Sequence, residues 1–277
     1  QAQAQSPSES LAPVVVTGTR TEERAFDLPM SVDAITRDEI QEGKARVNVC
    51  EVLNRAPGTF VQNRENFAQE LQITIRGFGA RSQFGTRGIK LIADGIPAST
   101  PDGQGSPGVF DLGSADRIEV LRGPFSALYG NHSGGVVQVF SESGTAPPTL
   151  TPDLALGSYG FQRYGLKGGG ISGAFNGMAS ASYFSVDGYR EHSAARKALF
   201  NTKLAYELNS TNRLTLVATG FDQPNAQDPL GLTQAQVQQD RGGLVRHAGV
   251  AIGGARGHAL EERQHAAHLP DVVEGGH

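Results

Sequence analysis

The second half of the sequence alternates between apolar and polar residues, which restricts it to antiparallel β-structure. Short polar turns separate the alternating stretches, which lie near 152–158, 161–169, 175–187, 200–208 and 214–219. Strands of about ten residues with one apolar and one polar face are typical of outer-membrane β-barrels. A soluble antiparallel sheet shows the same alternation, so both settings stay open. We predict about five consecutive antiparallel strands over 150–225.

The composition favours strands and excludes several classes of protein. Glycine supplies 36 of the 277 residues, about twice its average share. No run of 18 or more apolar residues is present to form a membrane-spanning helix. The single Cys50 excludes an intrachain disulfide framework and a thiolate zinc cluster. A net charge of −4 argues against nucleic acid as a partner. The sequence also lacks a nucleophile elbow, a zinc-protease helix and a phosphate loop, so we do not expect an enzyme.

Residues 26–144 mix helix and strand signals. Thr36 to Glu39 is a capping-box pattern, and Asn48 with Glu51 opens a second short helix. Strand patterns lie at 71–75, 89–92, 117–121 and 135–140. Long glycine-rich loops lie between them at 77–88 and 98–111. Long connections in a compact domain are usually functional. We therefore predict an α+β domain over 26–144, with a small mixed sheet, short helices and functional loops.

The N-terminal segment has two parts. Residues 1–12 are polar and indicate a flexible arm. The β-branched run Val14 to Thr17 follows, flanked by polar residues, and indicates a strand without a partner. The alternative is an ordinary edge strand.

Four short motifs occur in a characteristic order along the first half of the chain. They are Ile73 to Phe78 (ITIRGF), Leu91 to Pro97 (LIADGIP), Arg117 to Pro124 (RIEVLRGP), and Ala127 to Gly130 (ALYG) with Gly134 to Val137 close behind. This series resembles the plug domain of TonB-dependent outer-membrane receptors, in particular the ferric-siderophore type. The resemblance covers about 13–225. It implies a TonB box at 13–19 and a plug domain at 26–144. It also implies that 150–225 forms about the first five strands of a barrel, which has about 22 strands in such transporters.

The resemblance also implies which residues bind TonB and which hold the plug in the barrel. The C-terminal domain of TonB would add a strand to an extended, unpaired segment, here Val14, Val15, Val16 and Thr17. Arg76 and Arg122 each stand between a strand and a glycine. By resemblance they pair with barrel-wall glutamates outside this sequence and latch the plug, since guanidinium groups suit buried carboxylates. The alternative is that each pairs locally, for instance with Glu119.

Ligand contacts in this family come from outward-facing plug loops, which map to 62–67, 78–88 and 99–110. The predicted ligand-binding residues are Arg64, Phe78, Arg81, Ser82, Gln83, Phe84 and Arg87. A cationic, hydrogen-bonding and partly aromatic surface suits an anionic iron chelate. The alternative is a solvated glycine-rich loop. We expect no resident cofactor, because the iron chelate is the transported ligand.

Strand alternation stops after about residue 240, and two interpretations of the tail stay open. His258, His265 and His268 could hold a divalent metal on neighbouring turns of a helix. The mixture of Arg, Gly, Ala and His is also typical of a GC-rich gene read in a shifted frame, which we favour. On that interpretation 226–277 is a loop followed by an anomalous tail. Five strands cannot close a barrel, so we expect this chain alone to be a truncated, transport-incompetent form.

The sequence thus predicts a receptor in the bacterial outer membrane. It would contact membrane lipid, bind TonB, and take up a ferric siderophore or similar iron chelate. The alternative is a periplasmic plug-like binding module with a metal-binding, His-rich tail.

Overall fold

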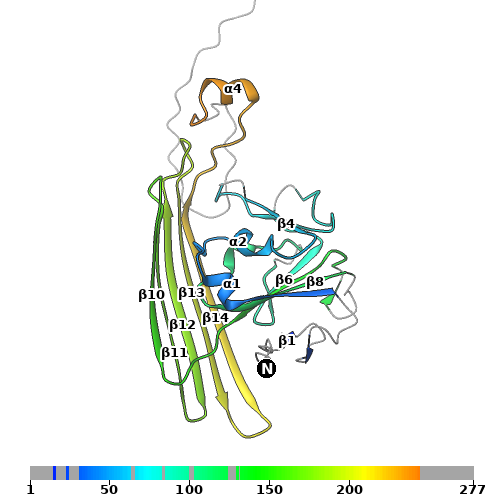
Figure 1. Cartoon of the computed structure of the whole chain (residues 1–277), viewed down its shortest axis with the longest axis vertical. Helices are drawn as coiled ribbons and strands as arrows, with labels where there is room; N and C mark the ends of the chain where they lie inside the picture. Colours follow the sequence, from blue (N-terminus) through cyan, green and yellow to red (C-terminus); the bar gives the residue numbers. More distant parts are fainter. Residues whose placement is uncertain are drawn as a thin grey trace, which may run out of the picture. The chain divides into compact units, whose positions relative to one another are not determined.

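Two five-stranded sheets make up most of the described chain (Figure 1). The structure, a computed structural model, describes residues 15–16, 23–24, 31–63, 66–82, 85–99, 103–123, 129–130 and 132–243. All of these belong to one structural unit, Gln1–Val245. Within these ranges, no helix has the length and apolar character needed to cross a membrane.

The first sheet is mixed, as predicted for the α+β domain. Its order is β3-β8-β9-β6-β7, and its strands are β3 (Ser31–Thr36), β6 (Ile89–Ala93), β7 (Ile96–Pro97), β8 (Ala115–Arg122) and β9 (Gly135–Ser141). Strand β8 pairs antiparallel with β3 and β9, while β6 pairs parallel with β9. Ile118, Val120 and Val137 on the central strands are fully buried. Such β-branched residues fit a sheet that is covered on both faces.

Short helices and a hairpin complete this domain. They are α1 (Arg37–Gln41), α2 (Cys50–Leu53), the 3-10 helix η2 (Pro107–Val109), and the hairpin strands β4 (Thr59–Gln62) and β5 (Gln72–Ile75). Helix α1 begins as predicted, because the Glu39 carboxylate accepts the Thr36 backbone N–H at 3.0 Å. Ile40, Leu53 and Ile73 are fully buried in the core beside the sheet.

The second sheet confirms the predicted run of antiparallel strands. Its five strands pair in chain order, and they are β10 (Thr149–Leu156), β11 (Gln162–Ser172), β12 (Phe175–Val186), β13 (Ala195–Glu207) and β14 (Arg213–Ala226). The connections 173–174 and 208–212 meet at one end of the sheet, and 157–161 and 187–194 at the other. Helix α4 (Gln234–Gln239) follows the last strand. Among the described strands the sheet is open, with β10 and β14 at its edges.

The two faces of the second sheet invert the pattern of a soluble protein. Large apolar side chains on one face are exposed, including Leu150, Leu166, Tyr183, Phe200 and Leu216. The opposite face, toward the first domain, buries the polar side chains Arg163, Ser180, Lys197 and Asn201. Exposed apolar and buried polar residues in alternation are the pattern of a barrel wall that faces lipid. This arrangement decides between the two settings that the sequence left open.

The N-terminal β-branched run has a partner in the structure. Strand β1 (Val15–Val16) pairs antiparallel with β2 (Glu23–Arg24). The expectation of a strand without a partner is therefore wrong for Val15 and Val16, which instead match the alternative of an edge strand, paired along one edge. Val14 and Thr17 lie outside the described residues.

Candidate functional site

Three plug loops that lie apart in the sequence form one surface. Thr86 and Gly105 exchange backbone hydrogen bonds of 3.3 and 2.7 Å. The Ser106 hydroxyl donates to Glu70 at 2.5 Å, and the Gln72 amide donates to two carbonyl groups of the second loop at 2.8 and 3.2 Å. We call this surface the loop face; it comprises the described residues of 62–72, 78–88 and 103–110.

The predicted ligand-binding residues that the structure describes lie on the loop face. Phe78 is 49% exposed, and Arg81 and Arg87 are exposed. Ser82 is half-buried, and its hydroxyl donates to the Gly85 carbonyl at 2.8 Å. Arg64, Gln83 and Phe84 lie outside the described residues.

The loop face also contains a small depression, and the sequence analysis anticipated only the part of its lining that lies in 62–67 and 78–88. It is lined by Gln62, Asn66, Gln69, Glu70, Leu71, Gln72 and Gly85. Four side chains of this lining already make hydrogen bonds to other parts of the structure, namely Asn66, Gln69, Glu70 and Gln72. The repeated Gln and Asn between 62 and 72 is the sequence signal that would have indicated it.

The loop face lies at the end of the second sheet where β14 finishes. Asp228 follows that strand, and its carboxylate accepts hydrogen bonds from Asn66 at 2.7 Å and Gln69 at 2.8 Å. Burial alone would raise the pKa of Asp228, but hydrogen bonds from the Leu230 N–H, Gln69 and Asn66, with the charge of His192, hold this pKa below its usual value. The eight-residue connection 187–194 lies at the same end. Because outer-membrane barrels carry longer loops outside and short turns in the periplasm, the loop face is directed outward.

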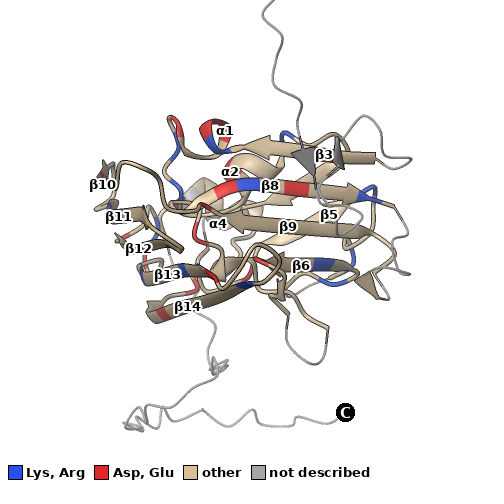
Figure 2. Ribbon diagram, turned by 90° about the horizontal axis from the view of Figure 1, so that it is seen from below, with Lys and Arg blue, Asp and Glu red and all other residues tan. Residues whose placement is uncertain are grey.

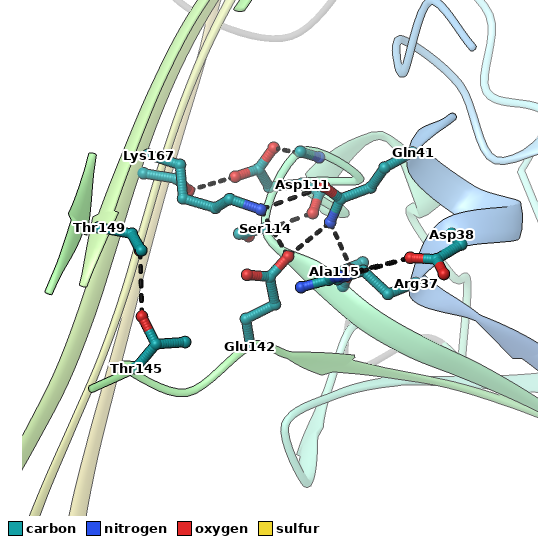
Figure 3. A network of polar contacts seen from close by, with 12 residues as sticks. Arg37, Asp38, Gln41, Asp111, Ser114, Ala115, Glu142, Thr145, Thr149 and Lys167 are labelled. Carbon is teal, nitrogen blue, oxygen red and sulfur yellow. Dashed lines mark hydrogen bonds and ion pairs between the residues drawn. The ribbon is translucent and has the colours of Figure 1, made fainter. Parts of the chain in front are cut away.

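Two lysines on the inner face of the sheet bind the plug through polar groups. Lys167 donates to Glu142 at 2.5 Å and to Gln41 at 3.1 Å, and Gln41 also donates to Glu142 at 2.6 Å (Figure 3). Lys203 donates to Asp94 at 3.3 Å and to a backbone carbonyl of β9 at 2.9 Å. The plug is therefore bound to the sheet by hydrogen bonds from charged groups, which are stronger than hydrogen bonds between neutral groups.

Further polar contacts extend this interface across the sheet, whose strands are seen from below in Figure 2. Lys197 donates to the Val47 carbonyl at 2.8 Å. Asn201 donates to two hydroxyl groups of the plug, and Ser180 donates to Asp111. Arg46 of the plug and Arg163 of the sheet both pair with Asp153. Breaking a buried pair by removing one partner costs about 3–5 kcal/mol, so these contacts fix the plug in one position.

Of the two predicted latch residues, Arg122 has a carboxylate partner inside the plug, as the local alternative expects, and that partner is Asp33. Arg122 pairs with Asp33 at 2.5 Å, whereas Glu119 is fully buried and accepts from Arg117 at 2.9 Å. Successive side chains of a strand point to opposite faces, which places Arg117 and Glu119 on one face of β8 and Arg122 on the other. Arg76 is exposed. A latch to glutamates outside this sequence stays a prediction.

The described residues contain no group of three or more His, Cys, Asp or Glu that could hold a metal. The alternative metal ligands His258, His265 and His268 lie outside the described residues.

Comparison with known proteins identifies the first domain. Residues 24–137 match the family model of the TonB-dependent receptor plug domain. The vitamin B12 transporter BtuB of Vibrio vulnificus is 30% identical over 146 residues, which are 52% of this chain and 23% of that protein. Its counterpart in Vibrio cholerae is 28% identical over 158 residues, covering 56% and 25%. The chain spans about a quarter of the length of these curated relatives.

Solved structures extend the likeness into the second sheet. The unliganded ferric citrate transporter FecA superposes with a TM-score of 0.66 at 24% identity, over 80% of this chain and 35% of that one. The pyoverdine receptor FpvA of Pseudomonas aeruginosa PAO1 gives 0.64 at 22% identity, over 76% and 30%. At these identities the likeness shows a shared fold. Residues 24–137 therefore belong to the plug-domain family of TonB-dependent receptors, and the strands that follow share the fold of the barrel wall in such receptors of the bacterial outer membrane.

Proposed function

We propose that this chain belongs to a receptor that takes up a ferric siderophore or similar iron chelate and is energised through TonB. The observation that carries the proposal is the loop face, which gathers three plug loops at the outward end of the sheet. Its exposed Arg81 and Arg87 suit an anionic chelate, because guanidinium groups bind carboxylate and similar oxygens in pairs. The relatives named above are transporters and receptors for vitamin B12, ferric citrate and pyoverdine, which supports uptake of a metal-containing compound.

Strand β1 supports coupling to TonB. Among the described strands it pairs with β2 alone. A strand has two edges, so a partner can still add to β1 by β-augmentation. Replacing Val15 by Pro removes a backbone donor and should abolish binding of the TonB C-terminal domain, whereas Val15→Thr should keep it. Equal binding by both variants would contradict the proposal.

Ferric citrate is a suitable probe for the ligand. We expect the chain in detergent micelles to bind it, and the double variant Arg81→Ala/Arg87→Ala to bind about tenfold more weakly, since one or two charged hydrogen bonds are lost. Equilibrium dialysis with radioactive iron measures both affinities. Arg213→Ala, at an exposed position on the opposite end of the sheet, is the matched control. No binding, or the same loss in the control, would count against an iron chelate.

A further inference from the structure

Asp228 connects the plug to the chain beyond the last described strand. It follows β14 closely, and its two carboxylate oxygens divide between two plug amides: one accepts from Asn66 and the other from Gln69, at 2.7 and 2.8 Å. The first oxygen also accepts the Leu230 backbone N–H at 2.9 Å. Ionised carboxylate offers acceptors only, so it can satisfy all three donors.

Neighbouring contacts hold the same plug segment against the sheet. The Gln223 side chain on β14 donates to the Phe67 carbonyl at 2.8 Å. The Phe67 ring packs on Phe184 of β12, with ring centroids 5.0 Å apart. Residues 66–69 belong to the loop face. This part of the loop face therefore contacts the barrel wall through the Phe67 carbonyl and ring, and contacts Asp228 through Asn66 and Gln69.

Arg190 contacts both ends of the segment that follows Asp228. Its guanidinium donates to the carbonyls of Pro229, Leu230 and Gly243 at 2.9, 2.6 and 2.9 Å. The Glu191 backbone N–H donates to the Gly242 carbonyl at 2.8 Å. Both ends of 229–243 are therefore fixed to the loop between β12 and β13. We call residues 228–243 the outer segment, since they lie at the outward end of the sheet.

We propose that Asp228 is a positioning residue that couples the outer segment to plug residues 66–69, so that a ligand bound against either segment changes the mobility of the other. The inference rests on the proposed function in that the loop face receives the ligand. Coupling between two segments is reciprocal by thermodynamic linkage. Weakening the contact from the plug side must therefore loosen the outer segment, and weakening it from the outer side must loosen the plug segment.

Amide hydrogen exchange of the full chain in detergent micelles tests this coupling without a ligand. In Asp228→Asn, a carboxamide NH2 replaces one acceptor oxygen and faces the amide donors of the plug. We expect exchange to accelerate about tenfold in peptides over 66–72 and 229–243 together. Asp228→Glu keeps two acceptor oxygens and should restore most of the protection. Asp222→Asn changes an exposed aspartate on β14 and is the matched control, which should change neither segment.

The reverse experiment changes the plug only. In Asn66→Ala/Gln69→Ala, the outer segment keeps its own sequence and its Arg190 contacts, yet the coupling predicts that its exchange also accelerates. Unchanged exchange over 229–243 in this variant, or acceleration of one segment alone in Asp228→Asn, overturns the inference. Exchange over the plug strands β8 and β9 shows whether a variant has unfolded. If Asp228→Asn has unfolded, the exchange of Asp228→Glu over 66–72 and 229–243 tests the coupling instead. Failure of ferric citrate to bind would count against the proposed function and leave these exchange rates as they are.

Discussion

At the scale of single residues, Asp94 serves both the plug and the barrel wall. It adopts a positive φ of 46° in the turn before Gly95. Its carboxylate accepts the Ser141 N–H at 2.9 Å and hydroxyl at 2.6 Å, and the Lys203 ammonium at 3.3 Å. The side chain is only 6% exposed. One carboxylate therefore closes a plug turn, fixes the end of β9 and neutralises a lysine of the barrel wall.

Substitutions at Asp94 should separate these roles. Asparagine tolerates positive φ and keeps one acceptor, so Asp94→Asn should lower the free energy of unfolding by about 1–3 kcal/mol through the lost ion pair. Asp94→Ala also loses the remaining acceptor, so Lys203 keeps only its bond to the Ser141 carbonyl and the loss should reach about 3–5 kcal/mol. Urea unfolding in micelles, followed by far-ultraviolet circular dichroism, measures both. Equal stability of the two variants would show that the ion pair carries the whole effect.

Glu39 gives the start of α1 a dependence on pH. The hydrogen bond from the Thr36 backbone N–H lowers the pKa of Glu39, with further help from Arg55 against a smaller effect of burial. A lowered pKa in the folded state means that the stabilisation is present above the ordinary carboxyl pKa and is lost as the pH falls through the folded-state value. We expect the stability difference between wild type and Glu39→Gln to shrink between about pH 6 and pH 3. Glu42→Gln, exposed just after the helix, is the control; a constant difference for Glu39→Gln would contradict the expectation.

At the scale of elements, Gly144 sets how closely the plug approaches the sheet. Its N–H donates to Asn176 of β12 at 2.8 Å. A Cβ atom at this position would lie 2.3 Å from the Gly170 carbonyl oxygen and 2.5 Å from that of Gly177. Both clashes are with backbone, which cannot turn aside like a flexible side chain. Glycine at 144 is therefore required by the close packing of the connection between the two domains.

Gly144→Ala should force β11, β12 and the connection apart. We expect the free energy of unfolding to fall by about 1–3 kcal/mol, the usual cost of overpacking. A Cβ atom at Gly220 of β14 would meet only the Phe200 side chain at 3.6 Å, an ordinary contact. Gly220→Ala should therefore be neutral or slightly stabilising in the same urea titration. A similar loss of unfolding free energy in both variants would contradict the argument that the close backbone contacts of Gly144 set its cost.

The sequence predicts the elements better than it predicts the contacts between them. Alternation identified the strands of the wall, because each strand has one face in lipid and one against the plug. The partners across the interface have no local signal: Lys203 and Asp94 are 109 positions apart, and Lys167 and Gln41 are 126 apart. Arg122 illustrates the difficulty, since the β3–β8 register brings it beside Asp33. Which side chains meet depends on this register, and the motifs alone do not carry it.

At the scale of the whole molecule, the exposed apolar face of the second sheet requires a lipid-like surrounding. Leu166 lies near the middle of β11 and is 51% exposed, while Leu208 is 61% exposed in the turn after β13. The cost of an arginine on a lipid face depends on its depth in the bilayer. The two positions therefore form a matched pair of equal chemistry and different depth.

Arginine at these two positions should show the depth effect directly. We expect Leu166→Arg to destabilise the protein in lipid vesicles by about 2–4 kcal/mol and Leu208→Arg by about 0–1 kcal/mol. Denaturant titration of vesicle-bound protein measures the difference. Equal costs would show that the face does not span the bilayer.

The strand order of the first sheet has a consequence for how the protein is made. The middle strand of β3-β8-β9-β6-β7 is β9, which is the last of the five along the chain. Neither β6 nor β8 can join the other until β9 is available between them, so the sheet is complete only after the chain up to residue 141 has been synthesised. Contacts of this long range are slow to form. Until β9 pairs, β8 and β6 each have one strand edge without a partner, and open strand edges favour association with other chains.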